Sequence, residues 1–296
     1  MKYDFVKIHG AGNDFVFIED MRDSLSFSQD QIAFICDRHF GVGADGLILV
    51  KPAKDDANDA FMDYYNSDGT KAQMCGNGVR CFAKYLVDNG LVDSSSGSLD
   101  AETRAGVKHI EYKLDGERRL VLARVDMGLP ILEGPKVPTT LPVNSDGMVI
   151  LAPLDTPFGH FDCTCVSMGN PHCVIFMPDS SYFTDPGSFD IRGVGPYLEC
   201  HDVFPEKCNI EFVHVDGMDG DWAQIHMRVW ERGDGETLAC GTGACAAGVA
   251  AYLTGQAGRK AHVHLLGGTL DIEWREDGHV MMTGPAVESF RGTIEF

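Results

Sequence analysis

The stretch Asn66–Gly90 reads N-S-D-G-T-K-A-Q-M-C-G-N-G-V-R-C-F-A-K-Y-L-V-D-N-G and places a cysteine where a loop becomes a helix. It follows Phe61–Tyr65, an aromatic-rich run typical of a strand. From Val79 onward apolar residues recur at helical spacing, and Asn89-Gly90 is a helix stop signal. Cys75 is therefore predicted at a helix start. Unpaired N–H groups and the helix dipole favour an anion there and lower the pKa of a thiol.

The same arrangement returns in the second half of the chain. Cys240-Gly241-Thr242-Gly243 repeats the pattern of Cys75-Gly76-Asn77-Gly78 and opens an Ala-rich helix. Gly12-Asn13 and Gly169-Asn170 each precede an apolar run. We interpret this as an internal duplication and expect an α+β fold of two pseudo-symmetric domains, each a mixed or antiparallel sheet wrapped around a central helix. Two such halves facing each other would bring both thiols to one cleft.

Composition limits the classes of function. The chain has 296 residues, enough for two domains, and an ordinary apolar share of 44%. Its net charge of −20 argues against nucleic acid and anionic membrane surfaces as partners. Neither a signal peptide nor a transmembrane stretch is recognisable, so we expect a cytoplasmic protein whose ten cysteines stay reduced.

Two motifs resemble a metal site and a nucleotide-binding loop, but we interpret the first as buried packing and the second as an ordinary loop. Cys163 and Cys165, near His172 and Cys173, lack the C-x-x-C spacing of structural zinc and alternate as on one buried face of a strand. Residues 41–46 match G-x-G-x-x-G, but they follow a predicted helix and precede a strand, the reverse of the nucleotide-binding order. The sequence therefore predicts no metal and no cofactor.

The paired cysteines are the candidates for chemistry. A Gly-rich helix start cradles an anion, and neither copy carries the Lys-Ser/Thr of a phosphate loop, so a carboxylate is expected. Two thiols beside one carboxylate can form a redox disulfide. Alternatively, Cys75 and Cys240 can exchange a proton at a carbon, one thiolate removing it from one face while the other thiol delivers one to the opposite face. Helix amides would stabilise the enolate-like charge.

Six motifs in order carry a resemblance to a known family. The chain resembles the diaminopimelate epimerases, which belong to the cofactor-independent amino-acid racemases and epimerases. The similarity runs essentially end to end. The motifs are H-G-A-G-N-D-F (9–15), N-S-D-G (66–69), M-C-G-N-G-V-R-C (74–81), S-M-G-N-P-H-C-V (167–174), N-I-E-F-V (209–213) and E-R-G-D-G-E-T-L-A-C-G-T-G-A (231–244).

The resemblance implies an activity and its residues. It implies interconversion of LL- and meso-2,6-diaminopimelate, a step towards lysine and peptidoglycan precursors, without pyridoxal phosphate or another cofactor. Cys75 would be the proton donor and Cys240 the acceptor, and His172 and Glu231 would adjust the pKa values of the thiols. A homodimer is expected. The implied substrate contacts are Asn13, Asn66, Gly76, Asn77, Asn170, Asn209, Glu231, Arg232, Gly241 and Thr242.

The expected domains are residues 1–133, joined by the returning segment 277–296, and residues 134–276. Residues 134–147, with three prolines, are the predicted crossing. Two positions depart from the family. Gly46 stands where a substrate-contacting Gln is common, and Met281 replaces a Tyr linked to dimerisation.

Some of these residues could instead have purely structural roles. Asn13 and Asn170 suit Gly-Asn turns, Arg232 suits a solvated loop, and His172 suits a structural role. The rival functions are a related two-cysteine racemase of an amino acid such as proline, a redox protein with a Cys75–Cys240 disulfide, and an amino-acid-binding module.

Overall fold

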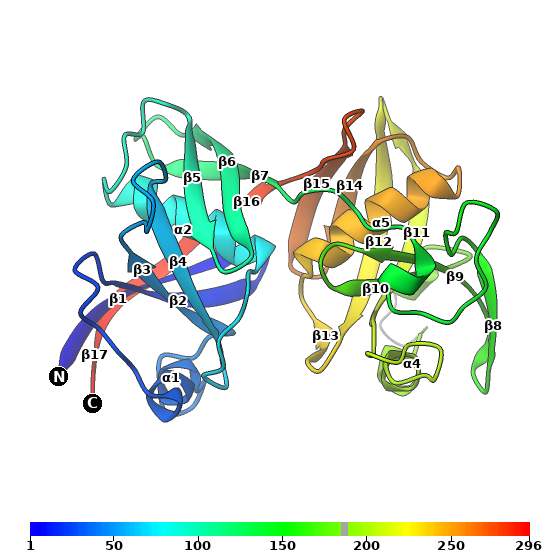
Figure 1. Cartoon of the computed structure of the whole chain (residues 1–296), viewed down its shortest axis with the longest axis horizontal. Helices are drawn as coiled ribbons and strands as arrows, with labels where there is room; N and C mark the ends of the chain where they lie inside the picture. The colour runs from blue at the N-terminus through cyan, green and yellow to red at the C-terminus, as the bar shows by residue number, and fades with distance from the viewer. Residues whose placement is uncertain (185–188) are drawn as a thin grey trace. The chain divides into compact units, whose positions relative to one another are not determined.

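The computed structural model describes residues 1–184 and 189–296, which form two compact units (Figure 1). Unit 1 comprises residues 1–126 and 283–296, and unit 2 comprises residues 127–282. The chain leaves unit 1 after Asp126, before the expected crossing at 134–147. Val137 and Leu141 are buried in the core of unit 2, which holds this proline-containing segment inside the second unit. The chain returns at Thr283, after the predicted 276/277 boundary.

Unit 1 is built mainly of strands, with two helices. A capping box at Ser28 starts α1, where the Ser28 hydroxyl accepts from Gln31 N and the Gln31 side chain accepts from Ser28 N. Its elements are β1 (Lys2–Gly10), β2 (Asn13–Glu19), α1 (Gln29–Cys36), β3 (Gly46–Lys51), β4 (Ala60–Asn66), α2 (Gly76–Asp88), β5 (Ser98–Thr103), β6 (Gly106–Leu114), β7 (Leu120–Asp126) and β17 (Val287–Glu295).

Unit 2 is also rich in strands. Its last strand, β16, continues past Met282 into unit 1. The elements are the 3-10 helix η1 (Gly134–Lys136), β8 (Ala152–Thr156), β9 (Gly159–Ser167), β10 (Pro171–Phe176), α3 (Ser181–Thr184), α4 (Ile191–Glu199), β11 (Asn209–Asp219), β12 (Trp222–Glu231), β13 (Gly235–Thr237), α5 (Gly241–Leu253), β14 (Lys260–Leu265), β15 (Gly268–Trp274) and β16 (Val280–Pro285).

The two units repeat one pattern of strand pairing. In unit 1, β1–β2 is antiparallel, β2–β3 parallel, β3–β4 antiparallel, β4–β5 parallel and β5–β6 antiparallel. The same succession runs through β9, β10, β11, β12, β14 and β15 of unit 2. The turn glycines correspond as well, since Gly12 and Gly169 both have positive φ, at 84° and 99°. Each half of the chain therefore folds by the same topology.

The helices after the two cysteines are the most buried elements of their units. Residues 76–87 of α2 are all buried, including Arg80 and Lys84, whose charges are met by hydrogen bonds within unit 1. In α5, Ala, Gly and Val leave no polar face, as expected for a helix surrounded by protein. α2 packs on β7, β1 and β2, and α5 packs on β15, β9 and β11. Within residues 1–184 and 189–296, no helix combines the length and apolarity needed to cross a membrane.

Candidate active site

Cys75 and Cys240 are the N-cap residues of α2 and α5. Both have extended backbone angles, with φ/ψ of −138°/124° and −115°/111°, so each side chain stands beside the first turn of its helix. The first N–H groups of a helix have no partner within it, and they point toward the N-cap. The structure therefore places each predicted thiol at the positive end of a buried helix. None of the ten cysteines, all in the described part of the chain, forms a disulfide.

In unit 1 the structure groups Cys75 with two of the predicted asparagines. The Cys75 thiol donates to Asn13 Oδ1 at 3.4 Å, and Asn77 Nδ2 donates to the same oxygen at 3.2 Å. Asn13 Nδ2 donates to Asp45 Oδ2 at 2.6 Å, which fixes the orientation of the amide. Asn13 is thus more than a turn residue, because its oxygen faces the thiol.

Asp45 belongs to a charged network that the sequence reasoning missed. Arg38 forms ion pairs with Asp14 and Asp45, at 2.8 and 2.7 Å. Lys7 pairs with Asp14 at 2.8 Å. Burial alone would raise the pKa of Asp14, but the hydrogen bonds and charges of Arg38 and Lys7 outweigh it and lower that pKa. The network holds the loop that orients Asn13, and its signal in the sequence is only the run R-H-F-G-V-G-A-D at 38–45.

Gly46 on β3 and Asn66 on β4 are register partners. Asn66 Nδ2 donates to Thr70 Oγ1 at 3.1 Å, so this side chain supports its own loop. A Cβ at Gly46 would lie 2.5 Å from the Tyr65 carbonyl oxygen and 2.6 Å from Tyr64 Cε2. A side chain at Gly46 would therefore require β4 to shift.

In unit 2 the thiol of Cys240 is buried and accepts a hydrogen bond from Gly243 N at 3.3 Å. Thr242 Oγ1 lies 3.5 Å from the sulfur. A Cβ at Gly243 would approach Glu211 Oε1 to 2.7 Å, so only glycine lets this N–H reach the sulfur. Burial, followed by the charges of Glu231 and Glu211, raises the pKa of Cys240 well above its usual value. Burial also raises the pKa of Glu231.

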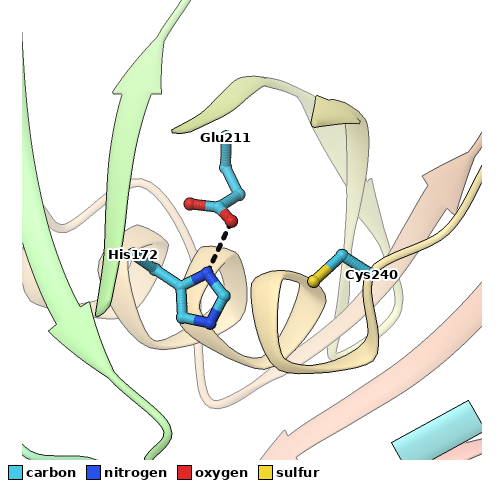
Figure 2. A group of neighbouring side chains, drawn as sticks. All are labelled: His172, Glu211 and Cys240. Carbon is cyan, nitrogen blue, oxygen red and sulfur yellow. Dashed lines mark hydrogen bonds and ion pairs between the residues drawn. The ribbon is translucent and has the colours of Figure 1, made fainter. Parts of the chain in front are cut away.

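Glu211 is the second residue that sequence reasoning missed. His172 Nδ1 and Glu211 Oε1 lie 2.6 Å apart, and both side chains are fully buried (Figure 2). His172 Nε2 lies 3.1 Å from Asn170 Oδ1. The pairing of Glu211 with His172 depends on the register of the parallel strands β10 and β11, which no local sequence pattern reveals. A buried acidic residue inside the strand N-I-E-F-V was the only available signal.

Asn209 holds the backbone at Pro171, next to His172, and the backbone at Arg232. Asn209 Nδ2 donates to Pro171 O at 2.7 Å, and Asn209 Oδ1 accepts from Arg232 N at 2.9 Å. The Arg232 side chain is exposed and donates to Glu206 O at 3.0 Å. Gly241 is buried in the first turn of α5. By contrast, Cys163, Cys165 and Cys173 lie within the apolar core, as predicted for packing residues.

Comparisons with known proteins agree with the motifs. The family model described as diaminopimelate epimerase matches residues 5–132 and 164–288. Diaminopimelate epimerase from Leptospira biflexa serovar Patoc is 43% identical over 295 residues, covering 100% of both chains. The protein of that name from Desulfitobacterium hafniense is 46% identical over 294 residues, covering 98% of each.

Solved structures share the fold at lower identity. A hydroxyproline epimerase from Agrobacterium vitis gives a TM-score of 0.69 at 14% identity, covering 99% of this chain and 91% of that one. A PhzF-family phenazine biosynthesis protein from Bacillus anthracis gives 0.68 at 14% identity, covering 100% of both. At such identity the likeness shows the two-unit, sheet-rich fold alone. The family match and the full-length relatives show that this chain belongs to the diaminopimelate epimerase family.

Proposed function

We propose that this protein interconverts LL- and meso-2,6-diaminopimelate, with Cys75 and Cys240 acting on the same α-carbon. The observation that carries the proposal is the placement of both thiols as N-caps of equivalent buried helices, in a chain of this family. The reaction would supply a precursor of lysine and peptidoglycan. It needs no cofactor, because thiolate and thiol supply both proton transfers.

The chemistry divides into removal and delivery of one proton. One thiolate takes the α-proton, the electron pair moves onto the carboxylate as an enolate-like charge, and the other thiol returns a proton to the opposite face. N–H groups at the starts of α2 and α5 stabilise the negative charge. Burial and the charges of Glu231 and Glu211 raise the pKa of the Cys240 thiol, which favours its protonated form. Cys75 would be the proton donor and Cys240 the acceptor in one direction of the reaction, and the two thiols exchange these roles in the other direction.

The remaining predicted residues would hold the amino acid. Asn13 and Asn77 lie beside the Cys75 thiol, and Thr242 lies beside Cys240. Asn209 and Arg232, with Asn66, would contact the distal carboxylate and ammonium. Asn170 and Glu231 complete the proposed set. His172 would act on Cys240 through Glu211, whose charge raises the pKa of that thiol.

The proposal extends to architecture and cellular setting. Each sheet would wrap around its buried helix, α2 or α5, which fits the burial of both helices in their units. We propose that the protein acts in the cytoplasm, where thiols stay reduced, and as a homodimer.

The test is solvent deuterium entry at the α-carbon, followed by NMR under reducing conditions without added cofactor. LL- and meso-diaminopimelate are offered separately, with L-proline and trans-4-hydroxy-L-proline as comparison substrates. We expect exchange accompanied by interconversion for diaminopimelate only. Exchange restricted to proline or hydroxyproline would assign a different racemase. Folded, reduced protein that exchanges none of them would overturn the epimerase, and a redox titration of the two thiols would then follow.

A further inference from the structure

His172, Glu211 and Cys240 bring three kinds of metal ligand to one buried place in unit 2 (Figure 2). One imidazole nitrogen, one carboxylate oxygen and the sulfur all lie within 4.8 Å of one another. The side chains come from β10, β11 and the N-cap of α5, so three separate elements converge. Within residues 1–184 and 189–296 no other group of three meets this spacing.

Glu211 supplies a second, independent observation. Its side chain is fully buried, and Oε1 is engaged by His172. Oε2 is also buried, yet it receives no hydrogen bond from any residue in the described part of the chain. Burying a carboxylate oxygen without a donor or a cation is costly, and a cation bound by this carboxylate would offset that cost.

The donor set selects the class of cation. Thiolate, imidazole and carboxylate together are ligands of zinc, whereas magnesium and calcium prefer all-oxygen sites. In a tetrahedral site with Zn–S of about 2.3 Å and Zn–N of about 2.0 Å, sulfur and nitrogen lie about 3.5 Å apart. The ligand atoms lie at most 4.8 Å apart, and His172 Nδ1 and Glu211 Oε1 lie only 2.6 Å apart, so zinc binding would draw the sulfur inward and separate this pair.

Charge favours the same cation. A Cys240 thiolate and the Glu211 carboxylate would bring two negative charges, which repel each other, to this one place. A divalent cation reverses this repulsion. As the sulfur–zinc bond forms, the thiol releases its proton to solvent and no electron is transferred. Gly243 N would continue to donate to the sulfur.

We propose that Cys240, His172 and Glu211 form an inhibitory zinc site, whose fourth position is open to water. Zinc bound there occupies the sulfur that the reaction needs. The inhibition rests on the proposed function, whereas the binding does not. The expectation of a metal-free reaction is unchanged, because the ion blocks catalysis instead of assisting it.

Cobalt(II) is the probe, because it replaces zinc and reports a thiolate ligand by an intense near-ultraviolet charge-transfer band. The reduced full-length chain is titrated with cobalt, and zinc is then added to displace it. We expect one cobalt per chain with this band. Cys240→Ser should abolish the band, and His172→Gln and Glu211→Gln should each weaken cobalt binding at least about tenfold. Circular dichroism checks that each variant folds.

Two controls separate this site from others. Cys75→Ser keeps all three ligands and should keep the band. His226→Gln disrupts the row His214, His226 and His264, which are register partners on neighbouring strands and could bind metal weakly, and it should keep the band too. Loss of the band in Cys75→Ser, or unchanged cobalt affinity in both His172→Gln and Glu211→Gln, would overturn the ligand set.

A measurement on the unaltered protein guards against misfolded variants. Zinc should slow alkylation of Cys240 by iodoacetamide, read by peptide mapping, while Cys200, the exposed cysteine, reacts as before. Equal alkylation of Cys240 with and without zinc would refute the site. In the deuterium assay, zinc should inhibit and a chelator should restore exchange. If exchange is missing even without metal, the proposed function fails while the cobalt band still decides the zinc site.

Discussion

The His172 imidazole and the Glu211 carboxylate lie 2.6 Å apart on neighbouring parallel strands, with both side chains fully buried. The register of the parallel strands brings the two side chains together. His172 aligns with Asn209, and Glu211 lies two residues after Asn209 on the same face of the sheet. Separating the partners would leave a buried polar group without its bond. The pair therefore links the stability of unit 2 to the surroundings of Cys240.

A double-mutant cycle on this pair should show strong coupling. We expect His172→Gln and Glu211→Gln each to lower the free energy of unfolding by about 1 to 3 kcal/mol, because an amide does not reproduce the buried imidazole–carboxylate contact. The double variant should lose less than the sum, with a coupling of about 0.5 to 3 kcal/mol. Urea denaturation measures all four proteins. Additive losses would mean that the observed contact contributes nothing to stability.

Single cysteine variants test the acid–base assignment. Cys75→Ala and Cys240→Ala should each lower kcat for diaminopimelate at least about 10²-fold, because each removes one proton-transfer group. Cys200→Ser is the control, since its thiol is exposed at the C-cap of α4, and it should keep full activity. Near-normal turnover in either Ala variant would exclude that thiol from the reaction.

The Asp14 network predicts a pH dependence of stability. The pKa of Asp14 is lowered on folding, so its ionised form stabilises the native state above the ordinary value of 3.8. This contribution is lost as the pH falls through the lowered folded pKa. Asp14→Asn should destabilise the protein at neutral pH by about 1 to 3 kcal/mol and flatten the decline in stability below about pH 4.

Chemical denaturation at a series of pH values between neutrality and acid measures this effect. Glu276→Gln, which changes an exposed carboxylate, is the control and should follow the unaltered protein throughout. A decline in Asp14→Asn as steep as in the unaltered protein would show that Asp14 is not responsible.

Gly46 tests whether packing explains the departure from the family pattern. Gly46→Ala should destabilise unit 1 by about 1 to 3 kcal/mol, because its methyl group meets the Tyr65 carbonyl and the Tyr64 ring. Gly116→Ala is the matched control, since a Cβ at that position meets nothing within 4 Å. Thermal unfolding distinguishes them. If Gly46→Ala unfolds at the same temperature as the unaltered protein, β3 and β4 can separate enough to accept a side chain.

The sequence by itself determined the local features and the family. Glycine spacing and hydrophobic periodicity act over a few residues, so the helices after Cys75 and Cys240 and the strand at Phe61–Tyr65 could be predicted. The motif resemblance is confirmed by the family match and the full-length relatives. The duplication, first visible in repeated motifs, reappears as the same succession of parallel and antiparallel pairs.

Tertiary structure decided what depends on contacts between distant segments. The prolines at 134–147 suggested a linker, whereas in the structure Val137 and Leu141 of this segment are buried in the core of unit 2. Asp45 and Glu211 became part of the site only when the loop after α1 met Asn13 and when β10 paired with β11. Such partners are fixed by strand register and core packing, which join residues tens of positions apart and leave no periodic signal in the sequence.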